Sequence, residues 1–351
     1  DVYKRQHISY STVWMEQPDA IEEVVFKKRP NIYVIQPDGY ANFKNLKDEP
    51  YRFDNTTFES FLSDNGFTLY DDFRSNYSTT LSSNSSMLTM RHHRFNNPKP
   101  GANEVYNSRD IIVGENPVVS IFKNNGYRTS LLLDKSYILV NRPKLGFDHC
   151  NINYSELSYL SRGFEVDKDV LKDLEHSIQQ ASDDPQFYFI EKIKPGHIAV
   201  LESDSKGVET ERQGYLKALQ EANDWLREVI ELIIRQDNDA MIIMVADHGG
   251  FVGLDYTLQS KTKQSEPDLV QSIFTSALAI RWSDEVPEFD SALKTNVNLF
   301  RILFTYLSED LTYLEHLQDN ISYSVIETGA PYGVYELINE NGQVVFKKFS
   351  Q

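Results

Sequence analysis

An acid, a histidine and two glycines follow directly on an apolar run near the middle of the chain's second half. The run from Met241 to Ala246 is continuous, whereas a half-exposed strand would alternate polar and apolar residues. It predicts a strand buried on both faces, as in a parallel sheet. Asp247 and His248 then stand at the carboxyl end of that strand, where ligands bind in such sheets. A carboxylate beside an imidazole suits a divalent metal, and the alternative is a pair that hydrogen-bonds a neighbouring loop.

Two other apolar runs also end in a residue that could bind a metal or an anion. Residues 31–36 form a short apolar strand that ends at Asp38, and the alternative reading is a simple Pro-Asp-Gly turn. Residues 187–193 form a further strand, followed by His197, for which the alternative is a loop histidine without a ligand. The carboxyl ends of parallel strands share one edge of a sheet, so these side chains could converge with Asp247.

A hydroxyl-rich segment at residues 74–88 offers candidate nucleophiles. Its polarity would fit a solvated linker, yet Leu81, Met87 and Leu88 fit one face of a helix that begins near Thr80. A hydroxyl at a helix N-terminus lies beside free N–H donors and the positive end of the helix dipole. The start of this helix is therefore a favourable place for an anionic group.

The elements that would position these residues alternate along the chain. Strands and helices follow one another from residue 29 onward, and the longest helix, predicted over 215–236, leads directly into the strand at 241. This alternation predicts a mainly parallel central sheet in an α/β fold. Near the end, 335–338 and 344–346 flank an Asn-Gly pair and predict a hairpin.

Between these elements, two stretches are predicted to be loops. Residues 91–117 hold His92 and His93 among prolines, asparagines and glycines, and residues 253–269 are polar. A strand is predicted over 272–281. Long loops in compact domains are often functional, so both histidines are candidates to line a pocket. Lys194, beside His197, could bind an anionic substrate.

The composition narrows the classes of partner. The chain has 351 residues, with 35 Lys plus Arg against 52 Asp plus Glu, so its net charge is −17. Such a surface repels nucleic acid and anionic membranes, and nucleic-acid binding is not expected. A single cysteine, Cys150, excludes a disulfide within the chain and a cysteine-based zinc site. No apolar run in this sequence approaches the ~20 residues of a membrane span.

The order of these candidates resembles the alkaline-phosphatase-like superfamily, in its sulfatase-like and lipoteichoic-acid-synthase-like branch. The resemblance covers roughly residues 29–325. It is carried by the opening strand with Asp38, by Asn76-Tyr77-Ser78-Thr79-Thr80, by the strand before His197, and by Asp247-His248-Gly249. It implies a three-layer α/β/α sandwich with a small C-terminal β-containing subregion. The implied organisation is an N-terminal extension over 1–28, a catalytic domain over 29–325 and a C-terminal hairpin over 326–351.

The resemblance implies roles residue by residue. Asp38, Thr80, Asp247 and His248 would be the ligands of one divalent metal, expected to be Mn²⁺, with Mg²⁺ or Zn²⁺ as alternatives. Thr80 would also be the nucleophile, and Thr79 is the rival for that role. A metal lowers the pKa of a coordinated hydroxyl, which would activate an otherwise poor nucleophile. His197 would bind substrate oxygens or protonate the leaving group.

Two departures from the family pattern restrict the expected chemistry. Sulfatases that carry formylglycine have a Cys/Ser-x-Pro/Ala-x-Arg motif, whereas Thr80 is followed by Leu-Ser-Ser-Asn, with neither the Pro nor the Arg. Members with two zinc ions have an additional Asp-x-x-x-His pair, but Ile193 stands four residues before His197. A single metal and a threonine nucleophile are therefore expected.

Three hypotheses follow. The first is a metal-dependent hydrolase or transferase of a phosphodiester, phosphoglycerol or phosphoethanolamine group, acting through a covalent phospho-threonine. Its substrate would be an anionic cell-envelope glycan or lipid head group, and the enzyme would be extracytoplasmic, with a membrane tether upstream. The second is sulfate-ester hydrolysis without formylglycine. The third is an inactive module that binds an anionic glycan.

Overall fold

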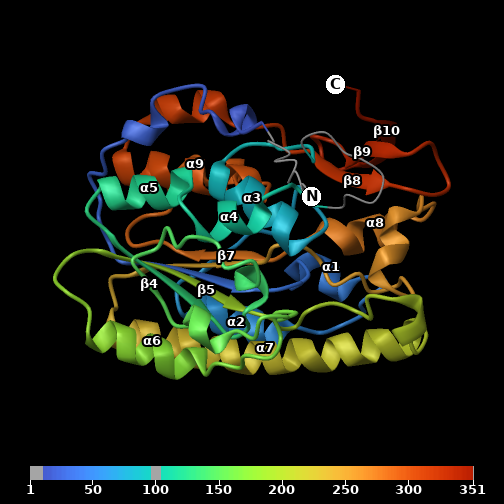
Figure 1. Ribbon diagram of the computed structural model, residues 1–351, viewed down its shortest axis with the longest axis horizontal. Coiled ribbons are helices and arrows are strands. Elements are labelled where there is room, and N and C mark those ends of the chain that lie inside the picture. Colours follow the sequence, from blue (N-terminus) through green and yellow to red (C-terminus); the bar gives the residue numbers. More distant parts are fainter. Residues whose placement is uncertain (1–10, 96–103, 351) are drawn as a thin grey trace, which may run out of the picture.

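A mainly parallel sheet divides the molecule into two layers of helices (Figure 1). The structure is a computed structural model and describes residues 11–95 and 104–350. Only β7 runs against its neighbours. In spatial order the strands are β2 (Thr68–Leu69), β7 (Leu278–Arg281), β6 (Met241–Val245), β1 (Ile32–Pro37), β5 (Gln186–Lys192), β3 (Arg128–Leu133) and β4 (His149–Cys150). The mainly parallel α/β fold predicted from the sequence is confirmed.

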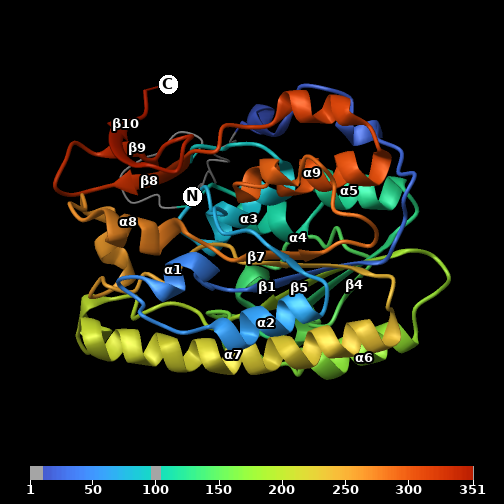
Figure 2. The same ribbon diagram turned by 180° about the vertical axis from the view of Figure 1, so that it is seen from behind.

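Helices cover both faces of this sheet, which is why its central strands are apolar throughout. Alternate side chains of one strand point to opposite faces, so Val34 packs in one core cluster and Ile35 in the other. The first face is covered by α3 (Thr80–Thr89), α4 (Ser108–Val113), α5 (Pro117–Asn124) and α9 (Asn296–Ser308). The second is covered by α2 (Thr56–Asp64), α6 (Val170–Gln179) and α7 (Val208–Gln236), with α1 (Phe43–Lys47) and α8 (Pro267–Phe274) at one end (Figure 2).

A small antiparallel sheet stands beside the first layer, near the C-terminus. It consists of β8 (Ser322–Ile326), β9 (Gly333–Ile338) and β10 (Val344–Lys348), with β9 in the middle. The predicted hairpin is present as β9 and β10, and the predicted boundary between 325 and 326 falls inside β8. The backbone N–H of Tyr323 donates to the Asn76 carbonyl at 2.8 Å, which ties this sheet to the segment that leads into α3.

Three segments differ from the predictions. The expected strand over 272–281 is wrong in its first half, because α8 continues to Phe274; a proline at its first position and buried Val270, Ile273 and Phe274 define a helix face. The loop expected over 91–117 contains α4 at its end. The longest helix begins at Val208 rather than 215, since its first turns are charged and exposed and carry no apolar periodicity.

Part of the predicted N-terminal extension, residues 1–10, lies outside the described residues, as do residues 96–103 of the expected loop. Over 11–95 and 104–350, no helix has the length and apolarity needed to cross a membrane.

Candidate active site

The two acidic strand ends meet because β1 and β6 are neighbours in the sheet. Ile35 pairs with Met244 in parallel register, so Asp38 and Asp247 leave the same edge side by side. The Asp247 Oδ1 accepts a hydrogen bond from the Gly39 N–H at 3.0 Å. Gly39 has φ +68°, and a Cβ there would overlap the carbonyl oxygen of Gly196. Glycine at position 39 thus lets the β1 end approach both Asp247 and the loop that carries His197.

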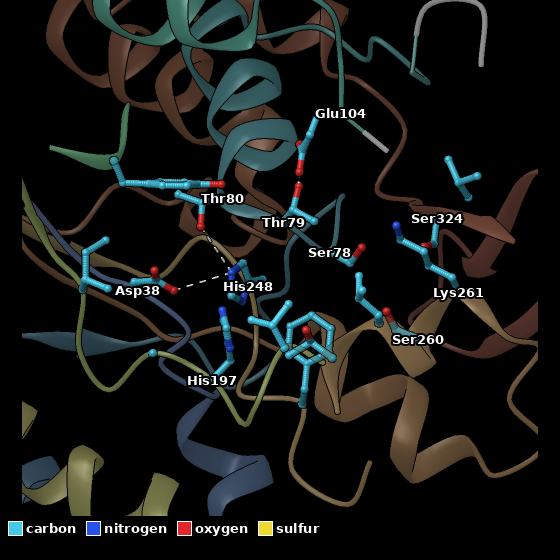
Figure 3. Close-up of a pocket in the computed structure, with 18 of the residues that line it drawn as sticks. Asp38, Ser78, Thr79, Thr80, Glu104, His197, His248, Ser260, Lys261 and Ser324 are labelled. Carbon is cyan, nitrogen blue, oxygen red and sulfur yellow. Dashed lines mark hydrogen bonds and ion pairs between the residues drawn. The ribbon is translucent and has the colours of Figure 1, made fainter. Parts of the chain in front are cut away.

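Four side chains converge on one point at this edge. The His248 Nε2 lies 3.5 Å from the Asp38 Oδ1 and 3.4 Å from the Thr80 Oγ1 (Figure 3). It lies 3.3 Å from the Asp247 Oδ2. Ligand atoms that share one tetrahedral ion, each about 2.1 Å from it, lie roughly 3.4 Å apart. The three distances from the His248 Nε2 are those expected if one cation lies among the four groups.

The donor chemistry of this group also fits a cation. The Asp38 Oδ1 and the Asp247 Oδ2 are buried without any hydrogen-bond donor among the described residues, and such orphans are rare. The His248 Nδ1 lies 2.8 Å from the Gly249 carbonyl, which can only accept, so Nδ1 carries a proton and Nε2 is the ring nitrogen that faces the carboxylates and could bind a cation. Potential metal ligands are the side chains of His, Cys, Asp and Glu. In the described part of the chain, one group of three of these has all its ligand atoms within 4.8 Å of one another, and it consists of Asp38, Asp247 and His248.

The pKa values of Asp38, His248 and Glu191 are raised where these charges lie close together. Burial, and then the neighbouring Asp247, raise the pKa of Asp38 to about 7. Burial lowers the pKa of His248, but the carboxylates of Asp247 and Asp38 outweigh it, so the net shift is upward. Glu191, on β5, is buried, and neither of its carboxylate oxygens has a hydrogen-bond partner within 11–95 and 104–350; burial, and then Asp38, raise its pKa well above the ordinary value. A bound cation would relieve this repulsion.

The two candidate threonines have different places. Thr79 is the N-cap of α3: its Oγ1 accepts from the Ser82 N–H at 3.4 Å and donates to the Glu104 carboxylate at 2.8 Å. Thr80 is the first residue of the helix, and its hydroxyl faces His248. Both line the cavity, but the structure brings only the Thr80 hydroxyl to the carboxylate–histidine group. The helix N-terminus adds N–H donors beside it.

His197 lies on the opposite wall, on the loop after β5. Its ring is 6.1 Å from that of His248, centroid to centroid, and is accessible from the cavity. The Nδ1 lies 2.7 Å from the Ile198 carbonyl and so carries the proton. The surrounding protein, and then His248, lower the pKa of His197. The ring is therefore neutral near pH 7, with an Nε2 lone pair that can accept a proton.

These residues open onto a cavity of about 480 Å³ with a second polar region. Lys261 and the hydroxyls of Ser78, Ser260 and Ser324 lie on the side away from Asp38 (Figure 3). Between the two regions the wall is largely apolar, with Phe95, Tyr137, Phe164, Ile193, Val200, Phe251, Leu258 and Val325. Lys261 is 3.8 Å from the Glu327 carboxylate, and burial lowers its pKa. The cavity thus has a local cation in an otherwise acidic protein.

Two of the lining residues, Lys261 and Glu104, were not among the candidates from the sequence. Lys261 stands in a polar stretch beside the similar Lys263, and no pattern separates the two. Glu104 lies in the loop that was expected to be functional, but its sequence neighbours carry no motif. Only the packing of these loops against α3 and β8 brings the two charges into the cavity.

Three candidates lie elsewhere. Both rings of the buried pair His92 and His93 are hydrogen-bonded: His92 to the Tyr77 hydroxyl and the Asp319 carbonyl, and His93 to the Ser82 carbonyl and the Phe95 N–H. Neither lines the cavity. Lys194 pairs with Glu221 on α7 and is not among the residues that line the cavity. The structure does not bring these three residues to the cavity.

Comparisons with known proteins identify the family and similar folds. A family model described as Sulfatase matches residues 38–303, a span that contains Asp38, Thr80, His197, Asp247 and His248. No curated protein sequence matches the chain.

Several solved structures share the fold at low sequence identity. The C-terminal periplasmic domain of EcEptC from Escherichia coli, in complex with zinc, is 14% identical, with a TM-score of 0.59 over 91% of this chain and 96% of that one. The putative sulfatase yidJ from Bacteroides fragilis is 13% identical, with a TM-score of 0.53 over 85% and 81%. The integral membrane protein lipooligosaccharide phosphoethanolamine transferase A from Neisseria meningitidis is 14% identical, with a TM-score of 0.50 over 87% and 59%.

Proposed function

Because the chain belongs to the sulfatase family, within the alkaline-phosphatase-like superfamily, we propose that it hydrolyses or transfers a phosphoryl-linked group through Thr80, with a divalent metal. The family match confirms the resemblance predicted from the sequence. The observation that supports the proposal most directly is the convergence of Asp38, Asp247 and Thr80 on the His248 Nε2, within 3.5 Å. Thr80 is preferred to Thr79 as the nucleophile because the Thr80 hydroxyl contacts His248, whereas the Thr79 hydroxyl donates to Glu104.

The residues that would hold one metal are Asp38, Asp247 and His248, with Thr80 as the fourth ligand. When bound, a divalent cation lowers the pKa of the threonine hydroxyl and polarises a phosphoryl oxygen of the substrate. The mixed carboxylate, imidazole and hydroxyl donors suit Mn²⁺, and Mg²⁺ or Zn²⁺ are the alternatives.

The protein's own side chains would carry out the attack on phosphorus, the proton transfers and the release of Thr80. The Thr80 oxygen attacks phosphorus while the bond from phosphorus to the leaving oxygen breaks. Neutral His197 accepts at Nε2 the proton that the Thr80 hydroxyl loses and returns it to the leaving oxygen. The N–H groups at the start of α3 hold phosphoryl oxygens, and Lys261, across the cavity, attracts a more distant anionic part of the substrate. Water, or a hydroxyl of an acceptor, then attacks the phosphothreonine and frees Thr80.

The substrate would be an anionic envelope glycan or lipid head group, and the protein would act outside the cytoplasm. EcEptC supports this location, since its domain is periplasmic, and the Neisseria protein acts as a phosphoethanolamine transferase on lipooligosaccharide. The group that is hydrolysed or transferred would be of the phosphodiester, phosphoglycerol or phosphoethanolamine type.

Sulfate-ester hydrolysis is the second candidate. The similarity of fold to the putative sulfatase yidJ favours it. A threonine at position 80 cannot be converted to formylglycine, which favours the phosphoryl reaction instead.

Both candidates are tested with metal-depleted protein and two chromogenic substrates. We expect Mn²⁺ to restore hydrolysis of bis(p-nitrophenyl) phosphate but not of p-nitrophenyl sulfate. Thr80→Ala should lower the phosphodiesterase rate at least about a hundredfold. As a matched control, Thr79→Ala should keep more than roughly a tenth of the rate, because it removes a helix cap and a hydrogen bond to Glu104 but not the attacking hydroxyl.

Each alternative gives a distinct result. Faster turnover of the aryl sulfate would establish the sulfatase reading, and a Thr80→Ala enzyme with the full phosphodiesterase rate would exclude the threonine mechanism. No turnover together with no metal-induced rise in Tm would favour an inactive glycan-binding module.

A further inference from the structure

Glu104 places a carboxylate in the same cavity, next to the proposed nucleophile. It comes from the chain between α3 and α4, and its Oε2 accepts from the Thr79 hydroxyl at 2.8 Å and from the Ser82 hydroxyl at 2.7 Å. Among residues 11–95 and 104–350, no Lys, Arg or His lies within ion-pair distance of this carboxylate. Protein surrounds it, and it is open to the cavity.

A carboxylate here conflicts with a substrate that is only anionic. Burial raises the pKa of Glu104, while the two hydroxyl donors, Arg109 and Lys261 oppose that rise and favour the ionised form. Its negative charge also reaches the metal group, since Glu104 contributes to the raised pKa of His248. Buried charges are normally paired, and an unpaired carboxylate beside an anion site adds repulsion. A cationic group on the substrate would pair with the buried carboxylate and would offset its repulsion of the anionic phosphoryl group.

The cavity that Glu104 lines has aromatic walls suited to such a cation. Tyr137, Phe95 and Phe164 line the cavity, and the rings of Tyr137 and Phe164 stack with centroids 5.6 Å apart. Aromatic faces attract ammonium groups. The Tyr137 ring already holds one cation in this way, because the Arg109 guanidinium lies 4.8 Å from its centroid.

We infer that Glu104 is a specificity-determining residue that receives the protonated amine of a substrate whose phosphoryl group lies at Thr80. The inference rests on the proposed function and narrows its substrate class. Head groups of the phosphoethanolamine type, with an ammonium a short linker away from phosphorus, are preferred over neutral head groups of the same length. The Thr79 and Ser82 hydroxyls hold the carboxylate in place for this contact.

The test compares two p-nitrophenyl phosphodiesters of nearly the same size, the 2-aminoethyl and the propyl ester. They differ in an ammonium against a methyl group. One charge-assisted hydrogen bond corresponds to about a tenfold to hundredfold preference in kcat/KM. We expect the wild type to prefer the aminoethyl ester by this factor. In Glu104→Gln, the ratio of kcat/KM for the aminoethyl ester to that for the propyl ester should be at least about tenfold lower. Glutamine can still accept from the two hydroxyls, so a purely structural role predicts an unchanged ratio.

Glu211 provides a matched control. It is half-buried, accepts hydrogen bonds from the Ala199 and Lys206 N–H groups at 2.8 and 3.0 Å, and holds a loop without lining the cavity. Glu211→Gln should keep the wild-type preference. Glu104→Asp, which retains the charge, should keep part of it even if Glu104→Gln folds poorly.

A binding measurement separates this inference from the proposed function. Calorimetry with O-phosphoethanolamine and propyl phosphate, on metal-loaded protein, needs no turnover. If neither ester is hydrolysed but phosphoethanolamine binds at least tenfold more tightly, and Glu104→Gln abolishes that ratio, the proposed reaction fails and the role of Glu104 stands. Equal binding of the two ligands by the wild type, or an unchanged ratio in Glu104→Gln, overturns the inference.

Discussion

Replacing Asp38 by asparagine should change stability in opposite directions with and without metal. In the metal-free protein the Asp38 carboxylate is buried, lacks a donor for Oδ1 and faces Asp247. Its pKa is about 7 in the fold against the ordinary 3.8. A folded-state pKa above the unfolded one means that the native state binds more protons, so stability falls as pH rises from about 4 to about 7.

The size of this penalty follows from the shift. The difference, 7 − 3.8, is roughly three pKa units, and at 1.36 kcal/mol per unit it corresponds to about 4 kcal/mol at pH 8 as an upper figure. Asparagine removes the charge and keeps the shape. Asp38→Asn should therefore be more stable than the wild type in EDTA at pH 8, by about 1–4 kcal/mol, with little difference at pH 4.

With bound metal, the wild type should instead be more stable than Asp38→Asn. A ligand present at a hundred to a thousand times its Kd stabilises the fold by about 2.7–4.1 kcal/mol. The wild type should gain this amount from Mn²⁺, whereas Asp38→Asn should gain much less. Denaturant unfolding at pH 4 and pH 8, with EDTA or with Mn²⁺, measures all four conditions.

Asp134 is the control, because it is equally buried but already paired. Its carboxylate lies 3.2 Å from the Lys192 Nζ and accepts from the Ile193 N–H at 3.1 Å. Asp134→Asn should lower stability in EDTA and leave the gain from Mn²⁺ intact. The reasoning is refuted if Asp38→Asn is less stable than the wild type in EDTA at pH 8, or if both variants gain equally from Mn²⁺.

Three further predictions concern the cavity. Thr79→Ala should destabilise the protein by about 1 kcal/mol through loss of the α3 cap, measured by denaturant unfolding, and no loss would contradict the capping role. Lys261→Met should raise KM for an aryl phosphodiester about tenfold, while Lys263→Met, whose ammonium lies over the Phe346 ring instead, should not; equal effects would remove Lys261 from the binding site. Since the pKa of His197 is lowered, the acid limb of kcat/KM against pH should fall below the ordinary 6.5 and disappear in His197→Gln; a limb above 6.5 would contradict a neutral imidazole.

The sequence predicted the strand-end residues well, for a physical reason. Runs that are apolar on both faces must be central strands, and a polar residue directly after such a run must lie at the sheet edge. That logic identified Asp38, His197 and Asp247. It could not predict that β1 lies between β6 and β5, since strand order depends on how the helices pack on both faces. The neighbouring positions of the two acids come from that order.

The residues that were missed come from loops. Glu104 and Lys261 belong to segments without periodicity, and their place depends on contacts with α3 and β8 that are distant in sequence. The converse holds for His92 and His93, which are conspicuous in the sequence but are bound into the packing around Tyr77. Side-chain chemistry alone does not distinguish a buried structural histidine from one that lines a pocket.

The most direct test of the account is anomalous X-ray diffraction at the manganese edge from crystals soaked in Mn²⁺. We predict one strong peak in this region, within coordination distance of Asp38, Thr80, Asp247 and His248. A peak that lies away from these four residues, or no peak at a Mn²⁺ concentration that raises Tm, would contradict the central claim.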